Sequence, residues 1–187
     1  MATPPRSSVY WYSRNEPAPS EALAHDLETE VLVIGGGMAG LSCAQKLQAE
    51  GHEVVVIERD FCGAGASGKS SGFITPDSEI ELSALLSTYG PTRAKHIWEF
   101  VLAGVETIRS TIQMHDIDCD YQIQDSLFIA NSPSTLRYIE AEHEARQRLA
   151  YASTLYDRTS LQEVIGSTAY AGAVRYPDTF GINPYRY

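Results

Sequence analysis

The sequence predicts an α/β fold that begins with one strand–helix–strand unit, and three observations support it. Residues 31–34 form a short aliphatic run, which is typical of a parallel strand buried on both faces. Residues 35–40 then carry the glycine pattern Gly-x-Gly-x-x-Gly. A second aliphatic run at 54–57 ends at the acidic residue Glu58. This order is that of the first unit of a Rossmann-like, dinucleotide-binding domain.

The glycine pattern has the spacing that a nucleotide diphosphate requires. Gly35 lets the chain turn sharply, Gly37 lets the backbone approach a pyrophosphate, and Gly40 lets the next helix pack close to the strand. That helix is expected at 38–48, with its free N–H groups facing the phosphates. Glu58 lies 18 residues after Gly40, where a carboxylate accepts hydrogen bonds from the adenosine ribose. We therefore expect a nucleotide site here.

The predicted helix has one face suited to packing against the strands. Leu41, Ala44 and Leu47 recur at helical spacing on that face, while Lys46 suits solvent. Gly51 is expected to end the helix before the second strand.

A second glycine-rich segment, FCGAGASGKSSGFI at 61–74, narrows the expected cofactor to a flavin. Its small residues permit close backbone approach and leave N–H groups free to donate, and Lys69 adds a positive charge. Residues 63–70 match the letters of a phosphate-binding P-loop, but no buried strand precedes Gly63 and Thr75-Pro76 follow too soon for a helix. A flexible surface loop is the alternative interpretation.

Composition excludes several classes of protein. The chain has 187 residues, 43% of them hydrophobic, and a formal net charge of -10, which argues against nucleic acid and anionic membrane surfaces as partners. No apolar run is long enough for a membrane span.

Three cysteines without Cys-x-x-Cys spacing suggest reduced thiols and a cytoplasmic location. The five histidines show no ligand spacing, so we expect no metal and assign no catalytic residue.

The rest of the chain alternates predicted helices and strands. Helices are expected at 79–89, 91–115, 133–150 and 160–165, and strands at 116–121, 126–130 and 171–176. The strands at 116–121 and 126–130 are expected to pair. Gly90-Pro91 separates the first two helices, and Pro177-Asp178 is expected to turn the chain after the last strand.

The longer helix at 91–115 carries an apolar stripe that we interpret as a core face. Its members are Ile97, Val101, Val105, Ile108 and Ile112, with Trp98 and Phe100 flanking them. Ser132 and Ser160 are expected to cap the two later helices, and Gly166 to end the last one. The charged residues of the 133–150 helix, Glu142 and Arg146 included, are expected to be mostly solvated.

Alternating aspartates precede the strand at 126–130. Asp116, Asp118 and Asp120 resemble a calcium-binding loop, but Tyr121 stands where that loop needs glycine and Leu127 where it needs glutamate. Period-two alternation into a half-buried strand is the better interpretation.

The ends of the chain suggest how its domains are organised. Residues 1–28 read as an extended arm, and the aromatic residues 10–12 either attach it to the body or belong to a free tail. Residues 29–90 are expected to form the first part of a cofactor domain, and 91–187 part of a substrate domain that returns near 182–187. Asn183-Pro184 looks like the start of a further helix. We therefore expect an N-terminal portion of a larger protein, completed by a second polypeptide.

Several stretches together resemble the flavin-dependent D-amino-acid oxidase/glycine oxidase superfamily, most closely its gamma-glutamylputrescine oxidase-like members. They are VYWYSRNEPAP, the fingerprint from 28 to 60, GAGASGKSSGF, IDCDYQIQDSLFIA and AGAVRYPDTFGINPYRY. The resemblance covers most of the chain. It implies an FAD domain interleaved with an α+β substrate domain built on an antiparallel sheet.

The resemblance also assigns the expected cofactor contacts. They are Gly35, Gly37, Met38, Ala39, Gly40, Glu58, Arg59, Ala66, Ser67, Gly68, Lys69, Ser70, Ser71 and Gly72. The family's usual Arg-Asn-Gly-Gly is Lys69-Ser70-Ser71-Gly72 here, which keeps the charge and loses the planar guanidinium. Some relatives attach the flavin through a histidine in this loop; Lys69 stands near that place, so non-covalent FAD is expected. Cys62 is an alternative attachment point.

The chemistry that the resemblance implies is oxidation of a C–N bond in a small amine or amino acid. Hydride passes to the flavin, the imine hydrolyses, and dioxygen or another acceptor reoxidises the cofactor. The family's substrate-binding residues tend to lie beyond residue 187. Two alternatives stay open: an NAD(P)-dependent dehydrogenase and a nucleotide-binding subunit without catalytic activity.

Overall fold

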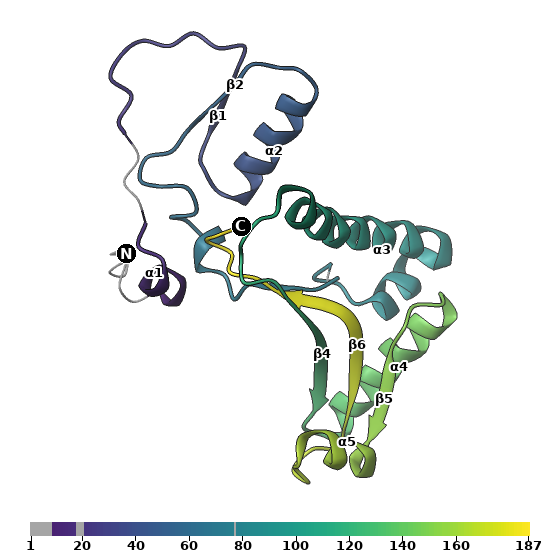
Figure 1. Ribbon diagram of the computed structural model, residues 1–187. Coiled ribbons are helices and arrows are strands. Elements are labelled where there is room, and N and C mark those ends of the chain that lie inside the picture. The colour runs from purple at the N-terminus through teal and green to yellow at the C-terminus, as the bar shows by residue number, and fades with distance from the viewer. Residues whose placement is uncertain (1–8, 18–20, 77) are drawn as a thin grey trace. The chain divides into compact units, whose positions relative to one another are not determined.

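The computed structural model describes residues 9–17, 21–76 and 78–187 (Figure 1). Internal contacts divide it into two compact units. Unit 1 holds the residues up to Gly72, together with Asp118–Asp120 and Ile182–Tyr187; unit 2 holds Phe73–Ile117 and Tyr121–Gly181. The chain therefore leaves unit 1 and returns to it twice. The division at residue 90 into cofactor and substrate portions stays a prediction.

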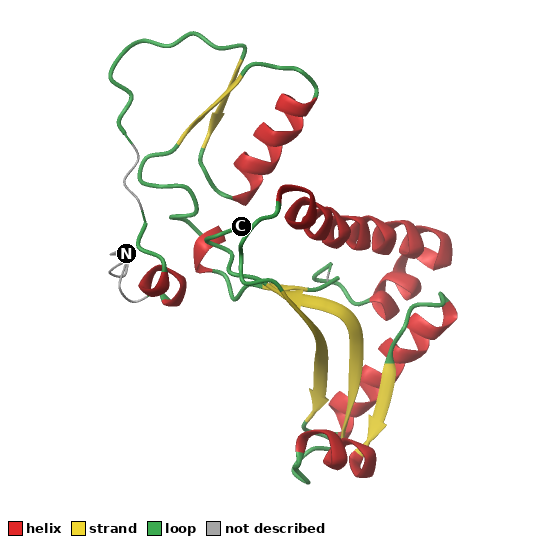
Figure 2. Cartoon of the chain, in the orientation of Figure 1, coloured by secondary structure: helices red, strands yellow, loops and turns green. Residues whose placement is uncertain are grey.

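Unit 1 contains the predicted strand–helix–strand unit (Figure 2). Strands β1 (Val31–Ile34) and β2 (Val54–Ile57) are parallel and in register along their full length. Helix α2 (Met38–Ala49) connects them and packs on both. The α/β class and the Rossmann-like unit are thus confirmed.

The prediction that the two strands and one face of α2 are buried is wrong in part. Ile34 is 79% exposed and Leu32 is also exposed, whereas Val33 is half-buried and lies against α2. Leu41 of α2 is exposed as well, although Ala44 is buried. Within the described residues this sheet has two strands and one covering helix, so one of its faces lies open.

The N-terminal arm contains a short helix, α1 (Tyr10–Arg14), where an extended segment was expected. Trp11 Nε1 donates to the Ser70 carbonyl at 2.8 Å, and the Tyr12 hydroxyl donates to the Gly63 carbonyl at 2.8 Å. Tyr12 is buried and packs edge-on against the rings of Phe61 and Tyr185. The attached arm, not the free tail, is therefore what the structure shows for 9–17; residues 1–8 and 18–20 lie outside the described part.

Unit 2 is built on an antiparallel sheet centred on the long strand β6 (Gly172–Gly181). Strand β4 (Gln122–Ala130) pairs along one side of β6, and β3 (Phe73–Ile74) and β5 (Thr154–Asp157) pair along the other. The turn expected at 177–178 is wrong, because β6 continues to Gly181. A register shift between Gln124 and Ser126 gives β6 a bulge there, and a bulge tolerates a proline.

Only one strand forms where two were predicted between 116 and 130. Asp116 ends helix α3 in a left-handed conformation with φ 48°, and Asp120 has φ 53°. These two turns break the extended backbone that the alternating pattern suggested. Strand β4 therefore starts at Gln122 and pairs with β6.

Three helices accompany this sheet. Helix α3 (Leu82–His115) bends at Gly90, whose φ of 75° is non-helical, so the predicted interruption is confirmed although the first turn starts three residues later than expected. Helix α4 (Pro133–Arg148) is capped by Ser132, whose Oγ accepts from the Thr135 N–H at 3.2 Å.

Helix α5 (Arg158–Ile165) is capped differently from the prediction. Asp157, and not Ser160, is the N-cap residue, because its carboxylate accepts from the Ser160 N–H at 2.8 Å. Gly166 ends α5 in the left-handed conformation, as expected.

One core cluster of unit 2 lies between α3 and α4, and its buried members are Leu82, Leu85, Ala94, Trp98 and Ala145. A second cluster, between α4 and the sheet, consists of Ala130, Ile139 and Val174. Ile112 from the predicted stripe is buried, but Ile97 is exposed and Phe100 points to solvent. The buried face of α3 therefore passes through Trp98, one residue from the predicted line. None of the described helices is long and apolar enough to cross a membrane.

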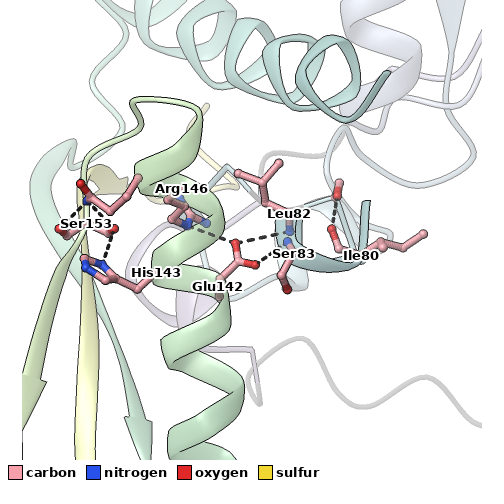
Figure 3. Close-up of polar contacts among 9 residues, drawn as sticks. Ile80, Leu82, Ser83, Glu142, His143, Arg146 and Ser153 are labelled. Atoms are coloured by element: carbon pink, nitrogen blue, oxygen red, sulfur yellow. Dashed lines mark hydrogen bonds and ion pairs between the residues drawn. The ribbon is translucent and has the colours of Figure 1, made fainter. Parts of the chain in front are cut away.

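The expectation that Glu142 and Arg146 are solvated is wrong. Their side chains are 1% and 6% exposed, and Arg146 Nε donates to Glu142 Oε1 at 3.2 Å. The Glu142 carboxylate also accepts the N–H groups of Leu82 and Ser83 at 3.3 and 2.9 Å, and so caps α3 from another helix (Figure 3).

Candidate cofactor site

The first glycine turn closes tightly on the start of α2. Gly35 has φ 108°, a conformation that favours glycine, and its N–H donates to the Ile57 carbonyl at 2.8 Å. A Cβ built on Gly40 would lie 2.0 Å from the Gly35 carbonyl oxygen. Gly40 therefore permits the close packing of helix on turn that the sequence predicted.

Glu58 is tied to this turn by its carboxylate. Oε2 accepts from the Gly36 N–H at 2.8 Å, and Oε1 accepts from the Asp60 N–H at 3.1 Å. These hydrogen bonds, first that from Gly36, lower the pKa of Glu58 below its usual value. The group is an ionised acceptor, and two oxygens with about four lone-pair positions retain capacity for further donors.

An open groove of about 400 Å³ runs beside this carboxylate. Ile34 and Gly35 line it from the end of β1, and Ile57, Glu58 and Arg59 line it from the end of β2. A Cβ built on Gly35 would meet no atom within 4 Å. The groove thus offers apolar walls to a planar base and a carboxylate to a sugar, and these residues fit the adenosine part of a dinucleotide.

Ser67 joins the second glycine-rich segment to the first. Its Oγ accepts from the Met38 N–H at 2.9 Å, and a Cβ on Gly37 would lie 3.2 Å from that same oxygen. The predicted contact residues Gly37, Met38 and Ser67 therefore lie together at the start of α2. The expected free N–H at Met38 is instead held by this hydroxyl, a contact across 29 residues for which the sequence carries no local signal.

The second segment has a defined conformation, which disfavours the flexible loop. Gly68 N–H donates to the Gly63 carbonyl at 3.1 Å, and a Cβ on Gly68 would lie 2.3 Å from that oxygen. Ile182 N–H donates to the Gly72 carbonyl at 2.9 Å. A P-loop continues into a helix, but the helical part of this segment is the three-residue 3₁₀ turn η2 (Ser67–Lys69). The structure therefore does not support the P-loop interpretation.

Of the predicted contact residues, only Gly35, Glu58 and Arg59 line the groove. The other predicted contacts do not line it, and Ala39, Ala66, Lys69, Ser70 and Ser71 among them are exposed. The contact of all these residues with the cofactor stays a prediction.

A group of contacts around Asn183 was not foreseen from the sequence. Asn183 is fully buried in unit 1; its N–H donates to the Cys119 carbonyl at 2.7 Å and its Nδ2 to Asp120 at 3.2 Å. Arg186 pairs with Asp118 and Asp120. The Asn183 side chain also accepts from the Tyr185 N–H at 3.1 Å, and the structure has a turn at 184–186 where the start of a helix was expected. The aspartates of 118–120 thus hold the final turn of unit 1.

Comparison with known proteins decides the family. Residues 30–187 match the sequence profile of the FAD-dependent oxidoreductases. The chain belongs to this family. FAD-dependent oxidoreductases of the amine and amino-acid oxidase type are enzymes, and FAD is the cofactor of the family.

Two curated relatives match nearly the whole chain. Gamma-glutamylputrescine oxidoreductase of Escherichia coli K12 is 32% identical over 90% of this chain and 39% of its own length. A probable oxidoreductase of Haemophilus influenzae is 29% identical over 96% of this chain and 42% of its own length. The chain therefore spans about two fifths of the length of these relatives.

Solved structures agree on the fold of the FAD-dependent family. Glycine oxidase from Geobacillus kaustophilus superposes with a TM-score of 0.68 at 17% identity, over 84% of this chain and 41% of that one. An L-amino acid deaminase from Proteus vulgaris reaches a TM-score of 0.71 at 17% identity, over 97% of this chain and 45% of that one.

Among the residues that the structure describes, no three His, Cys, Asp or Glu side chains gather into a metal site.

Proposed function

We propose that this chain supplies the FAD-binding part of an oxidoreductase that oxidises a C–N bond in a small amine or amino acid. The observation that carries the proposal is the Glu58 carboxylate held by the Gly36 N–H beside an open groove. Family membership supports the cofactor. The names of the relatives, a gamma-glutamylputrescine oxidoreductase, a glycine oxidase and an L-amino acid deaminase, support the class of substrate.

The chain's own residues would bind and orient the cofactor. The Ile34 and Ile57 side chains would contact the adenine, and Glu58 would accept hydrogen bonds from the ribose hydroxyls. The main chain around Gly37 would approach the diphosphate at the N-terminus of α2. When bound, FAD supplies two-electron redox chemistry, which suits oxidation of the C–N bond, hydrolysis of the imine and reoxidation by dioxygen or another acceptor.

We propose that the FAD is held without a covalent bond. Lys69 stands where covalent relatives are expected to carry histidine, and its side chain is exposed. Cys62 lies close to Gly36, with its Sγ 2.7 Å from the position of a Gly36 Cβ. The cofactor should therefore be released intact when the protein is denatured, and flavin that remains attached to the Cys62 peptide would contradict this.

Further polypeptide is proposed to cover the open face of the β1–β2 sheet. Support comes from the 79% exposure of Ile34 and from relatives more than twice as long as the matched segment. The completing segment, from this or a second polypeptide, would supply the substrate-binding residues. A cytoplasmic location stays a prediction.

Flavin binding tests the proposal most directly. FAD fluorescence should be quenched saturably as the chain is titrated in, with NAD⁺ and NADP⁺ failing to compete. Protein purified with its natural partners should carry a flavin absorption band and release peroxide or reduce a dye when amines are added, and mass spectrometry should identify any second polypeptide. A folded, colourless protein that leaves FAD fluorescence unchanged would overturn the proposal.

A further inference from the structure

Unit 2 contains a cavity of about 310 Å³ that lies outside the candidate cofactor site. Helix α3 contributes half of its lining residues, and the end of α4, the loop after it, Pro76 and Pro177 of β6 contribute the others. The lining residues that matter here are Trp98, Leu102, Val105, Arg109, Arg146 and Tyr151. Trp98 and Arg146 also line a smaller neighbouring cavity of about 180 Å³.

Two polar groups of this lining are buried without a hydrogen-bond partner among the described residues. They are the indole Nε1–H of Trp98 and the hydroxyl of Tyr151. Trp98 is 2% exposed, and the two ring centroids are 6.4 Å apart. A buried donor without an acceptor is unfavourable, so an occupant that accepts hydrogen bonds would remove this cost.

Burial also keeps the Tyr151 hydroxyl in its donating form. Desolvation, with a smaller effect of the Glu99 charge, raises the pKa of the Tyr151 phenol above its usual value. The group therefore remains an O–H donor throughout the physiological range.

The charged groups that line the cavity are held in ion pairs, and their guanidinium groups add N–H donors. Two guanidinium groups, Arg109 and Arg146, line the cavity with one carboxylate, Glu106. Arg146 is fixed by Glu142 and by the Trp98 ring, 4.7 Å from its guanidinium carbon, and Arg109 pairs with Glu106 at 3.1 Å. Each guanidinium is thus paired with one carboxylate, and both are donor-only groups that are held in place before any ligand arrives.

The rest of the lining is apolar. Leu102, Val105 and the Trp98 ring offer hydrocarbon surface next to the polar groups. A matching ligand combines an acceptor-only, anionic head with a compact hydrocarbon body. We propose that unit 2 holds a binding site for a small apolar monocarboxylate, with Trp98 and Tyr151 as hydrogen-bond donors. This site does not depend on the proposed FAD chemistry.

The two tryptophans of the chain make the test specific, because one lies in each unit. In a ¹H–¹⁵N spectrum of the whole chain, Trp98 and Trp11 each give one indole signal, and Trp11→Phe assigns them. Titration with cyclohexanecarboxylate to about 10 mM should shift the Trp98 signal saturably. The Trp11 signal, whose N–H is bonded to Ser70, should stay in place. Cyclohexanecarboxamide, the neutral analogue, should shift the Trp98 signal much less.

A conservative pair of variants separates binding from folding. Tyr151→Phe removes one donor and keeps the ring, and should weaken carboxylate binding about fivefold or more. Tyr89→Phe on α3, at an exposed position outside the lining, should leave affinity unchanged. A Trp98 signal that does not respond to the carboxylate would show a cavity filled by water only and overturn the proposal. Equal shifts with the carboxamide, or unchanged affinity in Tyr151→Phe, would also overturn it.

Discussion

The carboxylate of Glu58 and the main-chain N–H of Gly36 are 2.8 Å apart, which ties the end of β2 to the turn after β1. The same carboxylate borders the open groove, so one side chain both fixes the glycine turn and presents acceptors to a ligand. A substitution at Glu58 can therefore keep the hydrogen bond with the Gly36 N–H and still impair ligand binding.

Glu58→Gln should weaken FAD binding about tenfold or more, because hydrogen bonds to a charged group contribute about 1.5–3 kcal/mol. Glutamine keeps an oxygen for Gly36, so the folded structure should survive. The measurement is a fluorescence titration with FAD. Glu53→Gln, an equal change of charge at the exposed residue before β2, is the matched control. Equal affinities for the two variants would rule out Glu58 as a ribose ligand.

Gly40→Ala should destabilise unit 1 by about 1–3 kcal/mol, because the new Cβ would lie 2.0 Å from the Gly35 carbonyl oxygen. Gly104→Ala, inside α3 with no atom within 4 Å of the new Cβ, should instead stabilise the chain by about 0.5–1 kcal/mol. Urea denaturation followed by circular dichroism measures both. Shifts in the same direction would contradict the role assigned to Gly40.

The strand–helix–strand unit could be predicted from the sequence because its signals are local. The strands at 31–34 and 54–57 agree with the prediction residue for residue. The spacing of glycines, aliphatic runs and Glu58 fixes a backbone conformation without help from distant segments. Burial could not be predicted in the same way, because the exposure of Ile34 depends on which other strands cover the sheet.

The predictions were wrong where residues far apart in the sequence determine whether a side chain is buried or hydrogen-bonded. Glu142 and Arg146 have the i, i+4 spacing of a solvated surface pair, and only the folded neighbours Trp98 and Tyr176 make them a core pair. The Gly36 N–H that donates to Glu58 and the Ser67 hydroxyl that accepts from Met38 likewise belong to residues far apart along the chain.

The Asp157 cap of α5 should give a pH-dependent contribution to stability. Hydrogen bonds from Ser160, the backbone N–H first, lower the pKa of Asp157 below the ordinary 3.8. A carboxyl whose pKa is lower in the folded chain than in the unfolded chain stabilises the fold above about pH 4, and this contribution is lost as the pH falls through the lowered pKa. Carboxyl ¹³C signals should report titration of Asp157 below 3.8.

Ser160→Ala tests the cause of that shift. It removes the hydroxyl hydrogen bond to Asp157, which is 2.7 Å long, and keeps the N–H bond. The pKa of Asp157 should therefore rise part of the way toward 3.8. Thr159→Ala, one residue earlier, removes neither Ser160 bond and should leave the pKa unchanged. Titration of the parent Asp157 at or above 3.8 would refute the assignment of the cap.

Removal of Glu142 should be the most destabilising single change in unit 2. Glu142→Ala would leave Arg146 buried between the rings of Trp98 and Tyr176, 4.7 and 3.8 Å away, without its carboxylate, and would uncap α3. The expected loss is about 3–5 kcal/mol in urea denaturation. Glu99→Ala, in the exposed i, i+4 pair with Lys95, should change stability by less than about 1 kcal/mol.

A double variant separates pairing from packing. Glu142→Leu with Arg146→Met replaces both charges by hydrocarbon of similar size, so neither charge is left buried alone. It should be more stable than Glu142→Leu by itself, although α3 still lacks its cap. If the losses of the two single variants simply add, Glu142 and Arg146 are not coupled. In that case the cost of Glu142→Ala would come from the lost cap at Leu82 and Ser83.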